Sequence, residues 1–159
     1  MDPDIVEDET LQSTLKATHN KDEYIEHIIA AMKGLVQQLA LGGNTMNSTR
    51  TLQNTLRLLK LWFKRGWINQ IQQIFKSDFS KIDLQVWVSV IPQLIARIDI
   101  KSRPIREGTV HLLERISDTY PQSMLYAVNV MDRSSNPLRR DAAKRILSRI
   151  EEKNPTLVE

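Results

Sequence analysis

Basic side chains gather at two comparable places in the sequence, and these are the residues best suited to bind a ligand. They lie at or just after two expected helix starts: Arg103, Arg106, Arg139, Arg140 and Lys144. The free amides of a helix N-terminus attract anions, and guanidinium groups form paired hydrogen bonds with phosphate or carboxylate oxygens. The five residues are therefore candidate contacts for an anionic ligand or partner. The alternative is solvated surface charge that pairs within the chain, with Glu107, Glu114 and Asp141.

Residues suited to catalysis are sparse and scattered. The three histidines, His19, His27 and His111, lie far apart in the sequence, and there is no cysteine. An enzyme site needs a nucleophile, a base and an orienting group together, and zinc needs several nitrogen or sulfur ligands. The five glycines form no phosphate-binding loop. We therefore expect no catalytic, cofactor-binding or metal-binding residue, and the chain itself is predicted not to be an enzyme.

Charge is distributed unevenly along the 159 residues. Residues 1–26 hold eight acidic and two basic residues, whereas the rest holds 11 acidic and 20 basic residues. The basic body is suited to an acidic partner, a phosphorylated ligand or nucleic acid. Nucleic acid is not expected, because no base-stacking or groove-reading motif accompanies the charge. No apolar run approaches the roughly 20 residues of a membrane span, so the expected location is the cytoplasm, with the nucleus as the alternative.

Apolar residues recur at three- and four-residue spacing, which predicts an all-α protein. About seven helices are expected, at 21–41, 49–65, 68–76 and 84–98, and beginning near Pro104, Pro121 and Pro137. Asp83 and Asn136 are expected as N-terminal caps. Residues 1–20 are crowded with acids and are expected to form a disordered leader.

The residues expected to carry folding are mostly large and apolar: Leu56, Trp62, Trp87, Ile91, Pro92 and Leu113. The helix at 49–65 has one apolar stripe through Leu52, Leu56, Leu59 and Phe63, and a second through Leu58 and Trp62. A helix that is apolar on two faces is expected to lie between neighbours. Trp67, just after Gly66, is expected to be partly exposed.

Pro92 lies in the middle of the helix expected at 84–98. Proline inside a helix removes a hydrogen bond and clashes with the preceding turn, at a cost of about 3 kcal/mol. The pattern therefore predicts a kinked helix that packing on both sides holds in place. Such packing is typical of stacked helical hairpins.

The last part of the chain contains two similar units. Pro104-Ile105-Arg106 opens one helix and Pro137-Leu138-Arg139 opens another, 33 residues later, with Leu113 and Ile146 at the same offset. A period in the thirties with one helical hairpin per unit indicates an α-solenoid of the HEAT or TPR type.

Four stretches carry a family resemblance: 55–63 (TLRLLKLWF), 86–98 (VWVSVIPQLIARI), 120–126 (YPQSMLY) and 142–147 (AAKRIL). Together they resemble the C-terminal part of the FAT domain in target-of-rapamycin (TOR) kinases, which are phosphatidylinositol-3-kinase-related protein kinases. Three segments are expected. The acidic leader at 1–20 has no counterpart in the family. The resemblance implies helical repeats at 21–153 and, at 154–159, the start of a junction to a rapamycin-binding bundle that lies beyond this chain.

The resemblance also implies a function. The segment would be a non-catalytic helical scaffold of a TOR-type serine/threonine kinase, supporting and regulating its kinase domain in nutrient and growth signalling. The implied partners are the kinase domain and rapamycin-binding bundle of the same protein, TOR-complex subunits and an inositol polyphosphate. No catalytic residue of the family falls on these positions. The residues by themselves leave an alternative open, a free-standing helical-repeat adaptor that binds an anionic ligand or a partner protein through its basic helix starts.

Overall fold

The computed structural model describes residues 3–42 and 48–157, and within them the secondary structure is helical throughout. The elements are α1 (Pro3–Gly42), α2 (Ser48–Arg65), α3 (Asn69–Ser77), the 3-10 helix η1 (Phe79–Lys81), α4 (Leu84–Val88), α5 (Ile91–Ala96), α6 (Arg103–Thr119), α7 (Pro121–Asp132), α8 (Pro137–Lys153) and the 3-10 helix η2 (Pro155–Leu157). The all-α prediction is confirmed for this part of the chain. The sequence also predicts that Gly42-Gly43 ends the first helix, and Gly43 lies outside the described residues.

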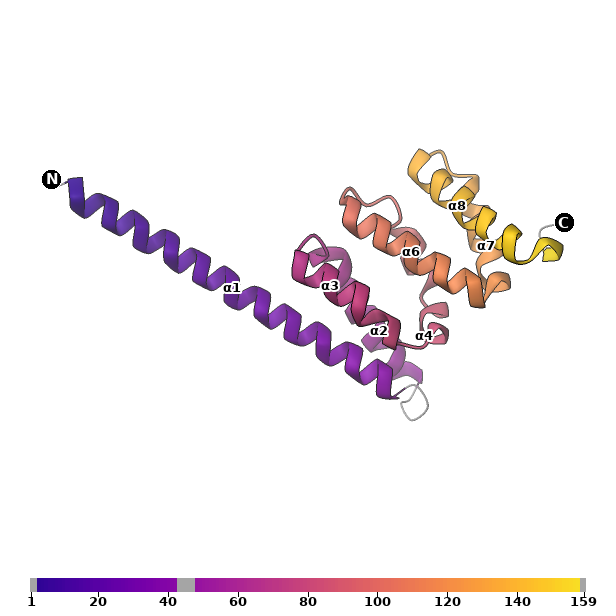
Figure 1. The fold of residues 1–159 in the computed structure, drawn as a ribbon, viewed down its shortest axis with the longest axis horizontal. Coiled ribbons are helices and arrows are strands. Elements are labelled where there is room, and N and C mark those ends of the chain that lie inside the picture. Colours follow the sequence, from indigo (N-terminus) through magenta and orange to yellow (C-terminus); the bar gives the residue numbers. More distant parts are fainter. Residues whose placement is uncertain (1–2, 43–47, 158–159) are drawn as a thin grey trace.

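The helices follow one another in two layers. Figure 1 shows α3, α6 and α8 as a row of roughly parallel helices that continues from α1. The second layer is formed by α2, α4, α5 and α7, and neighbouring pairs such as α2 with α4 and α5 with α7 are in contact. Each new helix therefore adds apolar surface to one continuous core, as expected for a solenoid.

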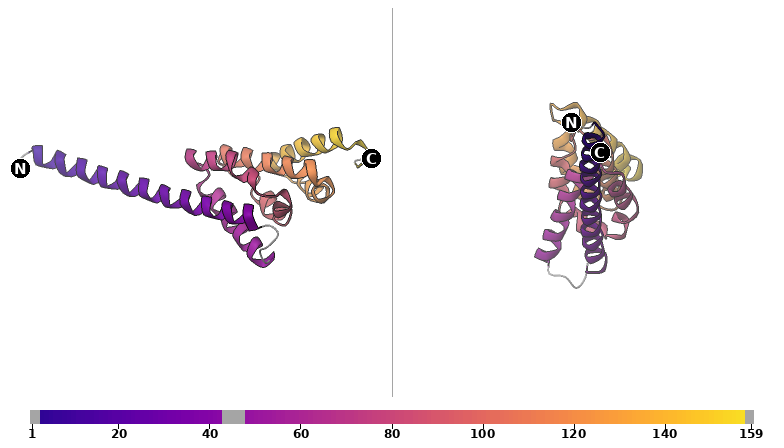
Figure 2. Two further views of the ribbon diagram at one scale, coloured as in Figure 1. Left: turned by 60° about the horizontal axis from the view of Figure 1, so that its bottom comes forward. Right: turned by 90° about the vertical axis from the view of Figure 1, so that its left-hand side faces the viewer.

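The helix α1 is longer than the sequence predicted. Its N-terminal half projects beyond the other helices (Figures 1 and 2), and its C-terminal half buries Ile28, Met32, Val36 and Leu39. Residues 3–20, expected to be disordered or loosely helical, belong to this one continuous helix in the structure. Helix propagation adds a hydrogen bond for each residue once a packed nucleus exists, and proline is tolerated in the first helical turn.

A column of aromatic rings joins α2, α3, η1 and α4. The ring of Trp62 stacks on Phe75 with centroids 4.0 Å apart, Phe75 lies 4.5 Å from Phe79, and Phe79 stacks on Trp87 at 5.4 Å. The indole N–H of Trp62 also donates to the hydroxyl of Thr109 on α6 at 3.2 Å. Trp62 and Trp87 are almost fully buried, so this column ties the first half of the chain to the second.

The other residues expected to carry folding divide between core and surface. Ile91 and Leu113 are buried as expected, and Trp67 is half exposed, as expected. The placement of Leu56 in the core is wrong, because 36% of this residue is exposed. Leu138, in the first turn of α8, is also exposed, whereas α8 turns Ala142 and Ile146 inward.

Pro92 does not kink a continuous helix. The segment 84–98 divides into α4, capped by Asp83 at its start as expected, and α5, which holds Pro92 in its first turn. Val90 between them has φ −115° and ψ 14°, outside the helical region. Proline in a first turn removes no intrahelical hydrogen bond, since the first four amides of a helix have no partner there. The helix break at Val90 thus avoids the cost of an internal proline.

The two C-terminal units repeat at 34 residues rather than 33. The N-caps Ser102 and Asn136 are 34 positions apart, and so are the C-caps Tyr120 and Asn154. Both C-caps adopt nearly the same conformation, and each donates its N–H to the carbonyl four residues earlier, at 2.7 and 2.8 Å. The similar Pro-x-Arg sequences are therefore one residue out of register in space.

Candidate interaction site

A line of ion pairs fastens α6 to α8. Acids on α6 lie seven and then four residues apart, at Glu107, Glu114 and Asp118, and face a basic side of α8. Arg149 makes a two-pronged contact with Asp118, Nε to Oδ1 at 2.6 Å and Nη2 to Oδ2 at 2.7 Å. Arg145 bridges the other two acids, at 3.0 Å to Glu107 and 2.7 Å to Glu114.

The pair of Asp118 and Arg149 is the electrostatic centre of this line. The hydrogen bonds from Arg149 are the main cause that lowers the pKa of Asp118 to about 2, and Lys153 at 3.0 Å adds to the effect against the opposing desolvation. The same bonds raise the pKa of Arg149. Glu114 is only 6% exposed and also receives a 3.2 Å hydrogen bond from Arg149. Asp118 is therefore held as a carboxylate between the two helices.

Two of the five predicted anion contacts donate hydrogen bonds to backbone carbonyls of the same chain. Arg106 donates from Nη1 to the carbonyl of Ile100 at 3.0 Å, and Arg140 donates from Nη1 to the carbonyls of Ser134 and Ser135 at 2.9 and 2.8 Å. Each arginine thus closes the loop just before its own helix, at equivalent positions of the 34-residue repeat.

The other three predicted contacts do not converge on one point. Arg139 lies 3.7 Å from Asp99 across the hairpin. Arg103 borders a shallow pocket between α6 and α8 that also holds the carboxylates of Glu107 and Asp141. Lys144 is exposed. The structure therefore spreads these residues along the edge of the stack instead of gathering them around an anion.

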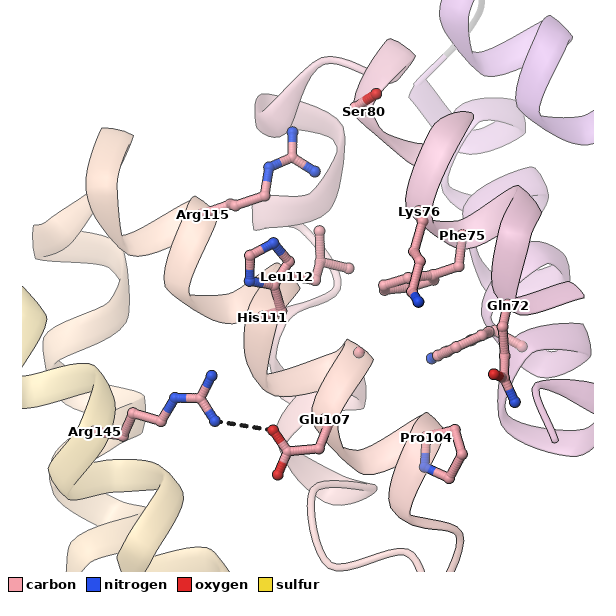
Figure 3. A pocket seen from close by; sticks show the side chains of 12 residues that line it. Gln72, Phe75, Lys76, Ser80, Pro104, Glu107, His111, Leu112, Arg115 and Arg145 are labelled. Carbon is pink, nitrogen blue, oxygen red and sulfur yellow. Dashed lines mark hydrogen bonds and ion pairs between the residues drawn. The ribbon is translucent and has the colours of Figure 1, made fainter. Parts of the chain in front are cut away.

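A deeper groove lies between α3 and α6, with α8 at one end. Its volume is about 550 Å³, and its rim carries Lys76 from α3, His111 and Arg115 from α6, and Arg145 from α8. Figure 3 shows these side chains around the opening, with Arg145 already joined to Glu107. Lys76 and Arg115 form no salt bridge with the described residues. The groove therefore combines unpaired positive charge with a concave surface.

The floor of this groove depends on a glycine. A Cβ atom on Gly108 would lie 2.7 Å from Cζ2 of Trp62 and 3.1 Å from Cε1 of Phe75. Only a residue without a side chain lets α6 approach the stacked aromatic pair this closely. Lys76, Arg115 and Arg149 were missed as site residues from the sequence. The basic spacing 145, 149 and 153 on one helix face was the signal that could have found Arg149.

The described residues contain no group of three or more His, Asp or Glu side chains placed to hold a metal ion. The groove offers cations and an apolar floor, which are suited to binding an anionic group.

Among the described residues, no helix is long and apolar enough to cross a membrane.

Two layers of helices, a repeated cap geometry at 34 residues and a continuous core define this chain as an α-solenoid of the helical-repeat class. Residues 70–158 match the family described as serine/threonine-protein kinase ATR-like, HEAT repeats. The chain therefore belongs to this family of HEAT-repeat segments, and the prediction of a HEAT-like solenoid is confirmed.

The curated relatives with the same segment include kinases of one group. The chain is 34% identical to the serine/threonine-protein kinase TOR of Arabidopsis thaliana over 134 residues, covering 84% of the chain and 5% of the relative. It is 35% identical to tor1 of Schizosaccharomyces pombe over 87% of the chain and 6% of the relative. It is 36% identical to mTor of Drosophila melanogaster over 84% of the chain and 5% of the relative. The chain thus spans about a twentieth of these relatives, and the predicted resemblance to TOR kinases is confirmed.

Proposed function

We propose that this chain acts as a non-catalytic scaffold segment of a TOR-type serine/threonine kinase, and that it supports and regulates the kinase domain of the same protein. Its other proposed partners are the rapamycin-binding bundle of that protein and subunits of a TOR complex. The proposed setting is nutrient and growth signalling, in the cytoplasm or the nucleus.

The line of ion pairs between α6 and α8 is the observation that carries this proposal. A buried charge is strongly destabilising when its partner is removed, and Glu114, which is 6% exposed, lies between Arg145 and Arg149, so these pairs hold the two helices at one fixed spacing. The equivalent caps at 34-residue spacing and the aromatic column add rigidity along the stack. A rigid stack is suited to hold other domains in position and to pass a shift at one interface to the next.

The test uses the whole protein that is translated from the transcript containing these 159 codons. This protein is called the parent protein. Trp62→Ala removes a ring that is 1% exposed, whereas Trp67→Ala removes one that is 52% exposed and serves as the matched control. We expect the parent kinase with Trp62→Ala to lose most of its phosphate transfer to a substrate peptide, and the Trp67→Ala protein to retain it. Phosphate transfer by the 159-residue chain alone, equal activity of both variants, or a transcript that encodes no kinase domain would each contradict the proposal.

The groove between α3 and α6 favours a second candidate, a helical-repeat adaptor that binds an anionic ligand such as an inositol polyphosphate. Lys76 and Arg115 would contact the ligand there, and Arg103, Arg139 and Lys144 would add long-range attraction. Calorimetric titration of the chain with inositol hexakisphosphate and with a short RNA tests this function. A heat of binding that disappears in the Lys76→Glu variant and decreases with added salt supports the adaptor function. The absence of a heat of binding with either ligand excludes this function.

A further inference from the structure

The helix α2 has an apolar face that the other described helices leave partly exposed. The opposite side of α2 packs its buried Leu58 and Trp62 against α1, α3 and α4. The partly exposed side carries Leu52 and Leu56, which are 38% and 36% exposed, and Phe63, which is partly buried against the core. The sequence predicted neighbours on both sides of this helix, and the described chain covers only one side fully.

The side chains of this face follow a seam pattern. Together with Leu59, which is only 2% exposed and lines the same groove, they recur at a four-three-four spacing along α2. This spacing is that of the a and d positions with which one helix packs along another. The row covers 11 helical steps, or about 16 Å at 1.5 Å per residue, which a partner helix of about three turns would cover.

The charged side chains that border this seam are all cationic. A groove of about 560 Å³ between α2 and α5 is lined by three of the four seam residues (Leu56, Leu59 and Phe63), by Lys60, Lys64 and Arg97, and by the uncharged Gln93 and Ala96. Neither α2 nor α5 contains an acidic residue. None of the three basic side chains forms an ion pair or a side-chain hydrogen bond with the described residues, and all three are exposed. Their charge is therefore available to a partner.

We propose that the α2–α5 groove binds an acidic amphipathic helix of a partner protein. Leucine-like side chains of that helix would fill the seam, and Asp or Glu side chains beside them would meet Lys60, Lys64 and Arg97. Symmetric pairing of two copies through this face is disfavoured, because a two-fold axis would place these cations against their own copies. This binding does not depend on the proposed support of a kinase domain.

The test measures binding of a defined probe to the full 159-residue chain by fluorescence anisotropy. The probe is a fluorescein-labelled synthetic peptide of about 18 residues, or about five helical turns, with leucines at the four-three-four spacing and glutamates beside them. Two control peptides have the same composition in scrambled order, or lysine in place of every glutamate. We expect the probe to bind, both control peptides to bind at least about tenfold more weakly, and added salt to weaken probe binding.

Two groove variants and two matched variants locate the binding. Leu56→Asp, and separately the pair Lys60→Glu with Lys64→Glu, should each weaken the probe about tenfold or more. Val130→Asp on α7, where 54% of the valine is exposed, and Lys144→Glu on α8 should leave it unchanged. All four variants replace exposed side chains and are expected to fold, and thermal melts check this.

Three outcomes would overturn the proposal. The first is no anisotropy change with the probe at a protein concentration of about 100 μM, where an interaction of about 5 kcal/mol would be visible. The second is equal binding of the scrambled peptide, or no effect of the groove variants. The third is self-association in sedimentation experiments that Leu56→Asp abolishes, which would assign the groove to a second copy, for example to its acidic N-terminal segment.

Discussion

Replacing Pro92 by alanine tests whether the segment 84–98 is one kinked helix or the two separate helices α4 and α5. The two cases predict stability changes of opposite sign. If Pro92 interrupted a continuous helix, alanine would restore a hydrogen bond and remove a clash, and the protein would gain up to about 3 kcal/mol. In the structure Pro92 lies in the first turn of α5 and is exposed. Alanine there gains no intrahelical hydrogen bond and only increases the conformational entropy of the unfolded chain, at a cost of about 0.4–1 kcal/mol.

The measurement is urea unfolding followed by circular dichroism. The free energies of unfolding are compared between proteins whose dependence on urea concentration, the m-value, is the same. We expect Pro92→Ala to lower the free energy of unfolding slightly and to leave helix content unchanged. Gln93→Ala, at the next exposed position of the same turn, is the control for loss of a surface side chain. A gain in stability above about 1 kcal/mol, together with higher helix content, would show that α4 and α5 join when the proline is absent and would refute the argument.

Three further predictions concern the core and the ion pairs. Trp87→Ala should lower the free energy of unfolding by about 3–5 kcal/mol, whereas Trp67→Ala should change it by less than about 0.5 kcal/mol; similar values in urea melts would contradict the assigned burial. Gly108→Ala should cost about 1–3 kcal/mol by overpacking against Trp62, and a neutral result would mean that α6 can shift freely. The lowered pKa of Asp118 makes its stabilisation fully present above about pH 4 and lost as pH falls toward 2. Because the pair is partly exposed, this amounts to about 1 kcal/mol, and Asp118→Asn should remove that part of the pH dependence; an unchanged acid profile would argue against the pair.

Much of the fold follows from local sequence patterns. The apolar periodicity predicted the helices α2, α3, α6, α7 and α8, and short polar side chains marked the starts of α4 and α8. Asp83 and Asn136 cap α4 and α8 by accepting an amide hydrogen bond at 2.9 Å each. These features act within one or two turns of chain, so the sequence alone specifies them.

The candidate sites could be predicted less well. Arg106 and Arg140 were expected at an anion site, but each can reach the carbonyls of the loop before its own helix, and that contact uses the charge. The groove cation Lys76 was not expected, because nothing near it in the sequence shows that α3 lies beside α6. The partner of a charged side chain depends on which groups the tertiary structure places near it.

The sequence by itself determined the helical class, the helix caps and the kinase family that this chain resembles, because each depends on residue types at short, regular spacing. Only the tertiary structure decided which apolar faces are covered. The stripe through Leu52 and Leu56 has the same hydrophobic pattern as a core stripe, yet the described chain leaves it partly exposed. Periodicity shows that a helix has an apolar face, but burial requires a second surface, whose position is set by long-range packing.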